Sequence, residues 1–134
     1  RQHEKRSMKT LLIFVSFLIF QSGCDSTTET SPSSLANVFQ VHLQWQFSKT
    51  PVTVFIDNSV IFSDTVSSSP MVGVAKIVPT KIVNGYHALR VTVLNSISKD
   101  TSFIVQDTLY IGVQYTKRDS LIEYYFTRKP FLYD

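Results

Sequence analysis

Residues 38–47 read VFQVHLQWQF, and this stretch decides the fold class. Apolar and polar residues alternate along it with a period of two, which is typical of a β-strand with one buried side and one side facing water. The buried side would carry Phe39, Val41, Leu43, Trp45 and Phe47. The other side would carry Gln40, His42, Gln44 and Gln46. The pattern therefore predicts Trp45 in the core and His42 at the surface.

Alternating segments recur along the rest of the chain, and no helical period is visible after residue 35. They are residues 52–58, 86–95, 107–115 and 121–127, with a short strand at 60–62, an extended stretch at 72–83 and a strand start at 102–105. In the last segment, Ile122, Tyr124 and Phe126 are expected to point inward. About seven to eight strands at this spacing predict a single antiparallel β-sandwich of the immunoglobulin-like kind. A small closed barrel is the alternative.

Turn residues separate these segments. Asn84-Gly85, between Val83 and Tyr86, is the strongest signal and predicts a two-residue hairpin of type I′. Residues 57–59 and 117–119 also have turn chemistry, and residues 65–70 and 95–100 are predicted to be loops. Pro79 indicates an edge strand or a bulge, because proline has no N–H for a ladder hydrogen bond.

Two of the predicted strands carry a narrower resemblance. Residues 52–58 read VTVFIDN and residues 83–91 read VNGYHALRV. They resemble PEGA-type domains, which have a V-x-V-x-I-D-G strand and later a G-x-H-x-L-x-V strand. Here Asn58 replaces the glycine, and the Pro-Glu-Gly-Ala sequence itself is missing. The resemblance covers about 40 residues and implies an envelope-attached, non-catalytic module.

Ahead of this domain, residues 8–24 read MKTLLIFVSFLIFQSGC. Lys9 precedes an apolar run, residues 11–20, which only Ser16 interrupts. As a helix this run would be about 15 Å long, against a bilayer hydrocarbon core of about 30 Å. The length therefore suits a signal peptide better than a membrane span. An ordinary secretory signal or a buried core helix is the alternative.

The last four residues of this segment, Gln21, Ser22, Gly23 and Cys24, resemble the lipobox of bacterial lipoproteins. Gln21 departs from the aliphatic residue usual at that position. The resemblance implies cleavage before Cys24 and a diacylglycerol on its thiol, usually with an acyl group on the new amine. Two or three acyl chains hold a protein stably at a membrane, where one chain does not. Cys24 is the only cysteine, so an internal disulfide is excluded.

The chain is thus predicted to have three parts: a leader at 1–24, a Ser/Thr-rich flexible tether at 25–36 and a β-sandwich domain at 37–134. Asp25 resembles an inner-membrane retention signal in some bacteria, whereas acidic residues soon after the cysteine resemble a surface-export signal in others. We expect a lipid anchor in the cell envelope, with the outer membrane or the cell surface preferred over the inner membrane.

The net charge of +3 belongs to the leader. Four basic residues and one acid precede Cys24, which leaves nine of the 13 basic and nine of the 10 acidic residues for the rest of the chain. The exported part is therefore neutral and has no field suited to a polyanion. We expect no nucleic-acid partner.

Residues that could carry catalysis or bind a metal are sparse. The histidines are His3, His42 and His87, and His87 shares the phase of Leu89 and Val91, which predicts a partly buried structural side chain. No nucleophile motif, phosphate-binding loop or zinc-ligand spacing occurs. Aspartates near strand ends could hold calcium between loops, but no calcium-loop motif is present. We expect no enzymatic activity and no cofactor.

Aromatic residues make up 13% of the chain. Tyr86, Tyr110 and Tyr125 are the candidates for exposed aromatic contacts, with Tyr115 and Tyr133 as further sugar-stacking candidates, although tyrosine is also a common strand residue. Two functions remain open. One is an envelope structural or protein-interaction module that docks another envelope protein through an edge strand or a face. The other is a glycan-binding accessory lipoprotein.

Overall fold

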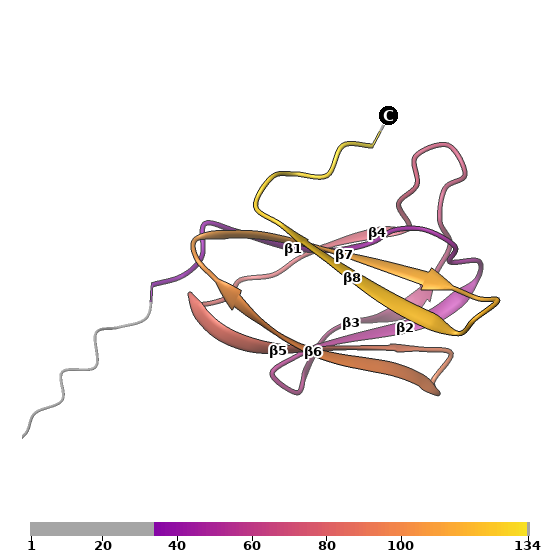
Figure 1. Ribbon diagram of the computed structural model, residues 1–134, viewed down its shortest axis with the longest axis horizontal. Coiled ribbons are helices and arrows are strands. Elements are labelled where there is room, and N and C mark those ends of the chain that lie inside the picture. The colour runs from indigo at the N-terminus through magenta and orange to yellow at the C-terminus, as the bar shows by residue number, and fades with distance from the viewer. Residues whose placement is uncertain (1–33, 134) are drawn as a thin grey trace, which may run out of the picture. The chain divides into compact units, whose positions relative to one another are not determined.

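The structure, a computed structural model, describes residues 34–133 (Figure 1). The predicted signal peptide, the predicted lipobox with Cys24 and most of the predicted tether lie outside the described residues. Ser33–Asp134 forms one compact unit. Among the residues described, no helix has the length and hydropathy needed to cross a membrane.

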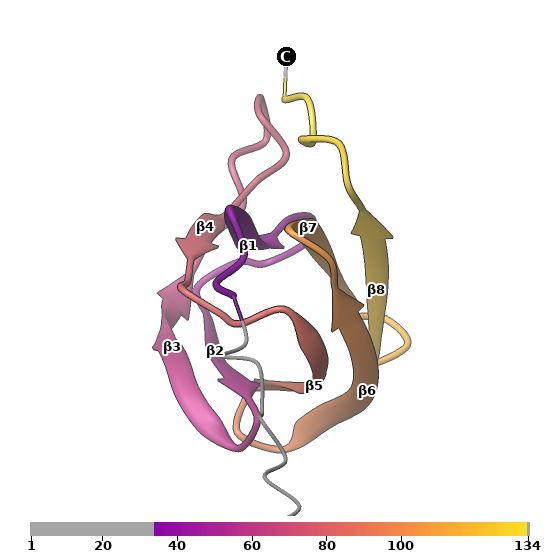
Figure 2. The ribbon, with the colours of Figure 1, turned by 90° about the vertical axis from the view of Figure 1, so that its left-hand side faces the viewer.

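The described chain consists of eight strands in two four-stranded sheets, so the predicted β-sandwich is confirmed. The strands are β1 (Val38–Leu43), β2 (Thr50–Ile56), β3 (Ser59–Val66), β4 (Lys76–Pro79), β5 (Gly85–Val93), β6 (Ile97–Val105), β7 (Thr108–Thr116) and β8 (Leu121–Thr127). One sheet has the order β4-β1-β7-β8 and is called the β1 sheet below. The other has the order β3-β2-β5-β6 and is called the β2 sheet (Figure 2).

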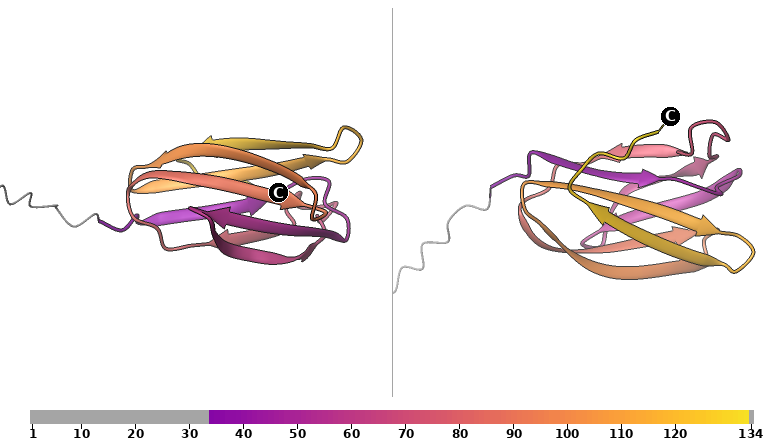
Figure 3. Two further views of the ribbon diagram at one scale, coloured as in Figure 1. Left: turned by 90° about the horizontal axis from the view of Figure 1, so that it is seen from below. Right: turned by 45° about the horizontal axis from the view of Figure 1, so that its top comes forward.

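Five of the six strand pairings are antiparallel, and β1 with β7 is the parallel exception. The two strands pair from Val38 opposite Thr108 to Leu43 opposite Val113, so both run the same way along the domain. The two sheets lie face to face as layers (Figure 3). Pro79 is the last residue of β4, which is an edge strand. This agrees with the prediction from proline, which has no N–H for a ladder hydrogen bond.

The core lies between the two sheets and is built from the residues that the period of two placed inward. Its fully buried members include Val41, Leu43, Val52, Val54, Leu89, Val91, Ile111, Val113 and Ile122. Phe39 and Phe103 stack across the sandwich with ring centroids 5.7 Å apart. Phe126 stacks on Phe103 at 6.3 Å but stays half exposed, because β8 and β6 are both edge strands and leave this side of the sandwich open.

The prediction that Trp45 lies in the core was wrong, because 48% of its side chain is exposed. β1 ends at Leu43, two residues before Trp45. Trp45 therefore lies outside the paired strand, and Gln46 after it takes a left-handed backbone conformation with φ of 69°. Phe47 turns back into the core, where it stacks on Tyr115.

The type I′ hairpin predicted at Asn84-Gly85 was also wrong. β4 and β5 belong to different sheets, so this dipeptide crosses between the layers. The Asn84 side chain accepts a hydrogen bond from the Asp107 N–H at 2.7 Å and donates one to Ser34 Oγ at 2.9 Å. Positive φ at two successive residues occurs instead at Asp57 and Asn58, in the turn between β2 and β3, and at Leu94 and Asn95, in the turn between β5 and β6.

Two strands extend further than their polar sequences predicted. β3 continues to Val66 and β6 begins at Ile97, where loops were expected. Both are edge strands whose polar side chains face solvent while the backbone pairs with β2 or β5. Pairing also begins early: Leu35 forms a bridge with Val83, inside the stretch predicted as tether.

Candidate functional site

The outer face of the β1 sheet is covered by the C-terminal segment, residues 128–133, which turns back over it after β8 (Figure 1). This cover corrects the expectation that His42 lies at the surface, because only 3% of His42 is exposed. The rings of Phe131 and Tyr133 pack on the imidazole at centroid distances of 5.2 and 5.7 Å. Gln44, expected to face water, is buried by the same segment.

A chain of hydrogen bonds joins the buried polar groups beneath this cover. Gln114 Nε2 donates to Gln44 Oε1 at 3.2 Å, and Gln44 Nε2 donates to the Tyr133 hydroxyl at 3.0 Å. That hydroxyl donates to His42 Nδ1 at 2.7 Å. The chain ends where His42 Nε2 donates to Gln40 Oε1 at 2.8 Å. The network assigns these directions, since each group then has one partner of the right kind.

The pKa shifts of His42 and Tyr133 agree with the donor and acceptor roles in this hydrogen-bond network. Burial lowers the pKa of His42, which favours the neutral imidazole that can accept from Tyr133. Burial likewise raises the pKa of Tyr133, against a smaller opposing effect of the Gln44 hydrogen bond, and so keeps the phenol protonated. Both ring nitrogens of His42 are engaged.

Gly112 makes room for the cover. A Cβ at this position would lie 2.8 Å from Gln44 Oε1 and 2.9 Å from Phe131 Cζ, so a larger residue would displace both side chains. Tyr110, predicted to be exposed, is only 9% exposed and meets His42 edge-on at a centroid distance of 6.0 Å. Tyr110 thus packs against His42, which itself lies under Phe131 and Tyr133 of the C-terminal segment.

A cavity of about 390 Å³, called the aromatic pocket below, opens beside the cover. Its apolar wall consists of Trp45, Met71, Val72, Tyr125, Phe131, Leu132 and Tyr133. The amides of Gln44 and Gln114 contribute polar groups to the same cavity. The pocket therefore combines exposed rings with hydrogen-bonding groups that already belong to an ordered network.

The loop at residues 67–75 holds Trp45 in place. Gly73, with φ of 77°, packs so closely on the indole that a Cβ there would lie 2.4 Å from Trp45 Cζ2. Ser68 ties this loop to the chain on either side of Trp45, because its hydroxyl donates to the Gln44 carbonyl at 2.5 Å and its N–H donates to the Phe47 carbonyl at 2.7 Å. Figures 1 and 2 both show the loop and the C-terminal segment projecting side by side.

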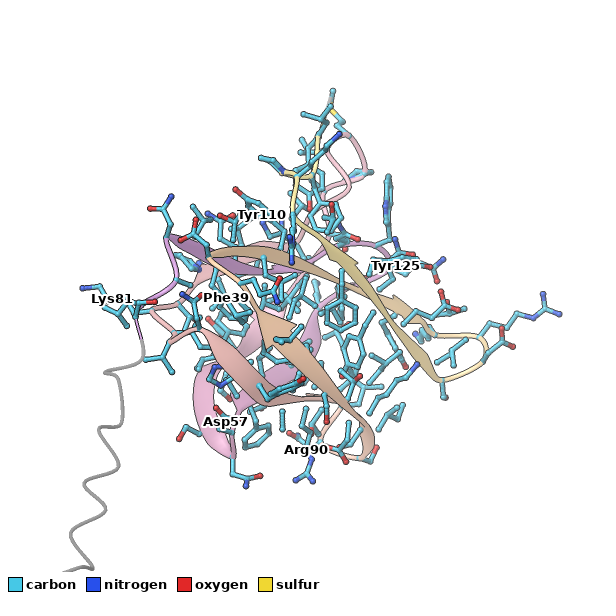
Figure 4. All side chains as sticks on the ribbon, turned by 60° about the vertical axis from the view of Figure 1, so that its left-hand side comes forward. Phe39, Asp57, Lys81, Arg90, Tyr110 and Tyr125 are labelled. Atoms are coloured by element: carbon cyan, nitrogen blue, oxygen red, sulfur yellow. The ribbon has the colours of Figure 1, made fainter. Side chains whose placement is uncertain are left out.

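Tyr125 is the one tyrosine of the three candidates that reaches the pocket (Figure 4). It lies opposite Gly112 in the β7–β8 register and is partly exposed. Its hydroxyl donates to Glu123 Oε2 at 2.7 Å, and this carboxylate raises the pKa of Tyr125. The hydrogen bond fixes the direction of the ring at the rim.

Tyr86 lies elsewhere. It is 84% exposed, as predicted, but it stands on β5 of the β2 sheet opposite Ile104. Of the further candidates, Tyr115 is buried in the core and Tyr133 is part of the cover. Sequence reasoning missed Trp45 and Met71. The apolar pair Met71-Val72 between Pro70 and Gly73 was the available signal, because apolar residues within a turn-rich loop have no strand to bury them.

His87 is structural and partly buried, as predicted. Its Nδ1 lies 2.5 Å from Asp57 Oδ2 and its Nε2 donates to the Val83 carbonyl at 2.7 Å. The hydrogen bond from His87 lowers the pKa of Asp57, with a further contribution from the Ala88 N–H. Asp57, labelled in Figure 4, lies in the turn between β2 and β3, and its contact with His87 joins this turn to β5.

Within residues 34–133, no three His, Cys, Asp or Glu side chains come close enough together to hold a metal ion. A scan against protein-family models found no match, and a search of curated proteins found none either.

Proposed function

We propose that this chain is a lipid-anchored, non-catalytic lipoprotein of the bacterial cell envelope that binds a glycan in the aromatic pocket. The observation that carries the proposal is the half-exposed Trp45 in the same pocket as the amide of Gln114, which is only partly buried. An indole offers a flat apolar surface to the C–H face of a pyranose, and amides bond to its hydroxyls. The cavity volume falls within the range of about 300–1,000 Å³ found for small-ligand sites.

The pocket is also ordered before any ligand arrives. Gly73 supports the indole, Glu123 holds the Tyr125 hydroxyl, and Gln44 is fixed by Tyr133 and Gln114. Groups that are already fixed lose little conformational entropy on binding, which favours affinity from a small number of contacts. This order supports a binding site.

Two further features support a non-catalytic role. The nitrogens of His42 bond to Tyr133 and Gln40, and those of His87 bond to Asp57 and Val83. A histidine whose two nitrogens are both engaged in structural bonds is poorly placed to accept a proton from a substrate. The PEGA-type resemblance of the strands at 52–58 and 83–91 points the same way.

The anchor rests on the lipobox at Gln21, Ser22, Gly23 and Cys24. It would place the domain at a membrane of the envelope, the outer membrane or the cell surface in preference to the inner membrane. Backbone pairing starts at Ser34 and Leu35, which bond to Asn84 and Val83 at the end of the domain where β1 begins. Trp45 follows the other end of β1. The pocket would thus be presented away from the tether.

The glycan proposal is tested with residues 26–134, which include every described strand. We expect the protein to be retained on at least one polysaccharide, and the emission of Trp45, the only tryptophan, to shift on binding. Trp45→Ala should weaken binding roughly thirtyfold, the effect of losing a contact worth about 2 kcal/mol. Tyr86→Ala is the matched control, because it removes an exposed ring outside the pocket and should bind like the wild type. Retention on no glycan, or equal binding by Trp45→Ala, would refute the proposal.

A protein ligand is the second candidate, and a specific observation favours it. Met71 and Leu132, at the rim of the pocket, are 85% and 88% exposed, and freely exposed apolar side chains are typical of protein contacts. The double variant Met71→Ser/Leu132→Ser separates the two candidates. It should abolish capture of a protein partner from solubilised envelope while leaving most glycan binding intact, since neither side chain carries a ring or an amide.

A further inference from the structure

The end of the domain where the described chain begins carries a second surface, distinct from the aromatic pocket. Four apolar side chains are exposed there, and backbone pairing joins them two by two, with Val83 and Tyr86 three residues apart in the sequence. Leu35 forms a bridge with Val83, and Tyr86 stands opposite Ile104. Tyr86 is among the most exposed large side chains of the described residues. An apolar cluster with a tyrosine is the composition that favours the interface between lipid and water.

Basic residues flank this cluster. Lys81 extends into solvent one residue before Ile82, whose carbonyl accepts from the Ala36 N–H at 2.8 Å (Figure 4). Arg128 is exposed and bonds to Gln106, and it lines a groove of about 330 Å³ together with Ile104 and Phe126.

The acidic side chains at this end do not cancel the two cations. Asp57 is engaged by His87 and by the Ala88 N–H. Asp107 accepts from the Asn37 N–H at 3.3 Å and is the one other acid nearby. With Lys129 next to Arg128, the balance at this end is positive, although the exported part as a whole is neutral. Positive charge beside apolar side chains is complementary to an anionic lipid surface.

The number of residues between Cys24 and the first described residue limits how far Cys24 can lie from this surface. Only the nine residues 25–33 separate Cys24 from Ser34. Fully extended they reach at most about 30 Å, and a Ser/Thr-rich coil of that length spans on average about 16 Å. If Cys24 is lipidated, lipid headgroups are therefore present at this end at a high effective concentration.

We propose that the surface formed by Leu35, Lys81, Val83, Tyr86, Ile104 and Arg128 contacts anionic phospholipid headgroups beside the anchor. The proposal rests on the lipid anchoring of the proposed function. The contact holds the domain by this end, with Tyr86 and Leu35 at the headgroup level and the two cations on phosphate groups. It thereby turns the aromatic pocket away from the membrane.

Unlipidated residues 26–134 test this surface separately from the anchor. We expect the protein to sediment with vesicles of phosphatidylethanolamine and phosphatidylglycerol, three to one, and not with pure phosphatidylcholine vesicles. Lys81→Glu/Arg128→Glu should weaken binding at least about twentyfold, since each cation near an anionic surface contributes about fivefold. Lys117→Glu/Arg118→Glu is the matched control at the β7–β8 turn and should bind more than tenfold better than the first variant.

An apolar variant and the emission of Trp45 test the same surface without any change of charge. Tyr86→Ser/Ile104→Ser should also lose vesicle binding, while the emission of Trp45 in the wild type should stay unchanged when vesicles are added. Absence of vesicle binding, or a blue shift of Trp45 that shows the pocket entering lipid, would overturn the proposal. Neither outcome bears on glycan binding or on acylation of Cys24, which are measured in separate experiments. The membrane-contact proposal can therefore be refuted while the proposed function stands, and the reverse.

Discussion

At the scale of one residue, His42 shows how polar side chains on the outer face of a strand can be buried. A face of glutamines and a histidine was covered by two aromatic rings, and each buried polar atom found a partner in the hydrogen-bond chain from Gln114 to Gln40. No buried side-chain nitrogen or oxygen among the described residues lacks a partner. Buried polar networks of this kind stabilise one arrangement only when every member is satisfied.

The neutral state of His42 predicts a pH dependence of stability. The pKa of His42 in the folded protein is below its ordinary value of 6.5, so the unfolded chain binds the proton first. Stability from neutral His42 is thus fully present above about pH 6.5 and declines as the pH falls below it, by at most about 1.4 kcal/mol per pH unit. In urea unfolding of residues 26–134, the advantage of the wild type over His42→Gln should shrink between pH 7.5 and pH 5.5.

The comparison isolates His42 because other titrations are shared by both proteins. Asp57, whose pKa is lowered by the hydrogen bond from His87, contributes stability above its ordinary value of 3.8 and loses it only at lower pH, outside this window. An unchanged gap between wild type and variant across the two pH values would contradict the neutral assignment of His42.

At the scale of elements, the C-terminal segment, residues 128–133, forms no strand but packs on the sandwich as the eight strands do. It supplies Phe131 and Tyr133 to the outer face of the β1 sheet and forms part of the wall of the aromatic pocket. We expect deletion of residues 130–134 to lower the free energy of unfolding by about 2–4 kcal/mol, because two rings lose burial and the Gln44 and His42 side chains lose their shared partner.

Urea unfolding measures this effect, and Leu132→Ala is its control. Leu132 belongs to the same segment but is almost fully exposed, so its truncation should change stability by less than about 0.5 kcal/mol. If the deletion left the unfolding midpoint where it is in the wild type, the segment would not be packed on the sheet as described.

Elements also show what the sequence could and could not predict. Alternation along β1, β2, β5 and β7 identified the core correctly, because side chains on a paired strand must take opposite faces. It failed at Trp45, which lies beyond the end of β1, and at His42, whose cover comes from a distant part of the chain. Asn84-Gly85 failed because a dipeptide cannot tell a hairpin from a crossover between sheets. The aromatic pocket was missed because a strand end, the loop at residues 67–75 and the distant C-terminal segment build it together.

At the scale of the whole molecule, the proposal joins a domain of known fold to an anchor that lies outside the described residues. Cys24→Ala should abolish incorporation of radiolabelled palmitate and release the protein from the membrane fraction, because no other cysteine can carry the lipid. Gln21→Leu, which restores the usual lipobox residue, should keep labelling or increase it. Labelling of Cys24→Ala at the level of the wild type would refute lipidation at this residue.

The parallel pairing of β1 with β7 has a mechanical consequence for such a tethered molecule. β1 begins just after the tether side of the domain and ends just before Trp45, so it is the only strand on the covalent path between them. A captured ligand pulled away from the cell would put β1 under tension along its own axis. Because β4 and β7 flank it on both edges, the force would be spread as shear over two rows of backbone hydrogen bonds. The other five strands could keep their fold while the backbone hydrogen bonds of β1 to β4 and β7 are strained.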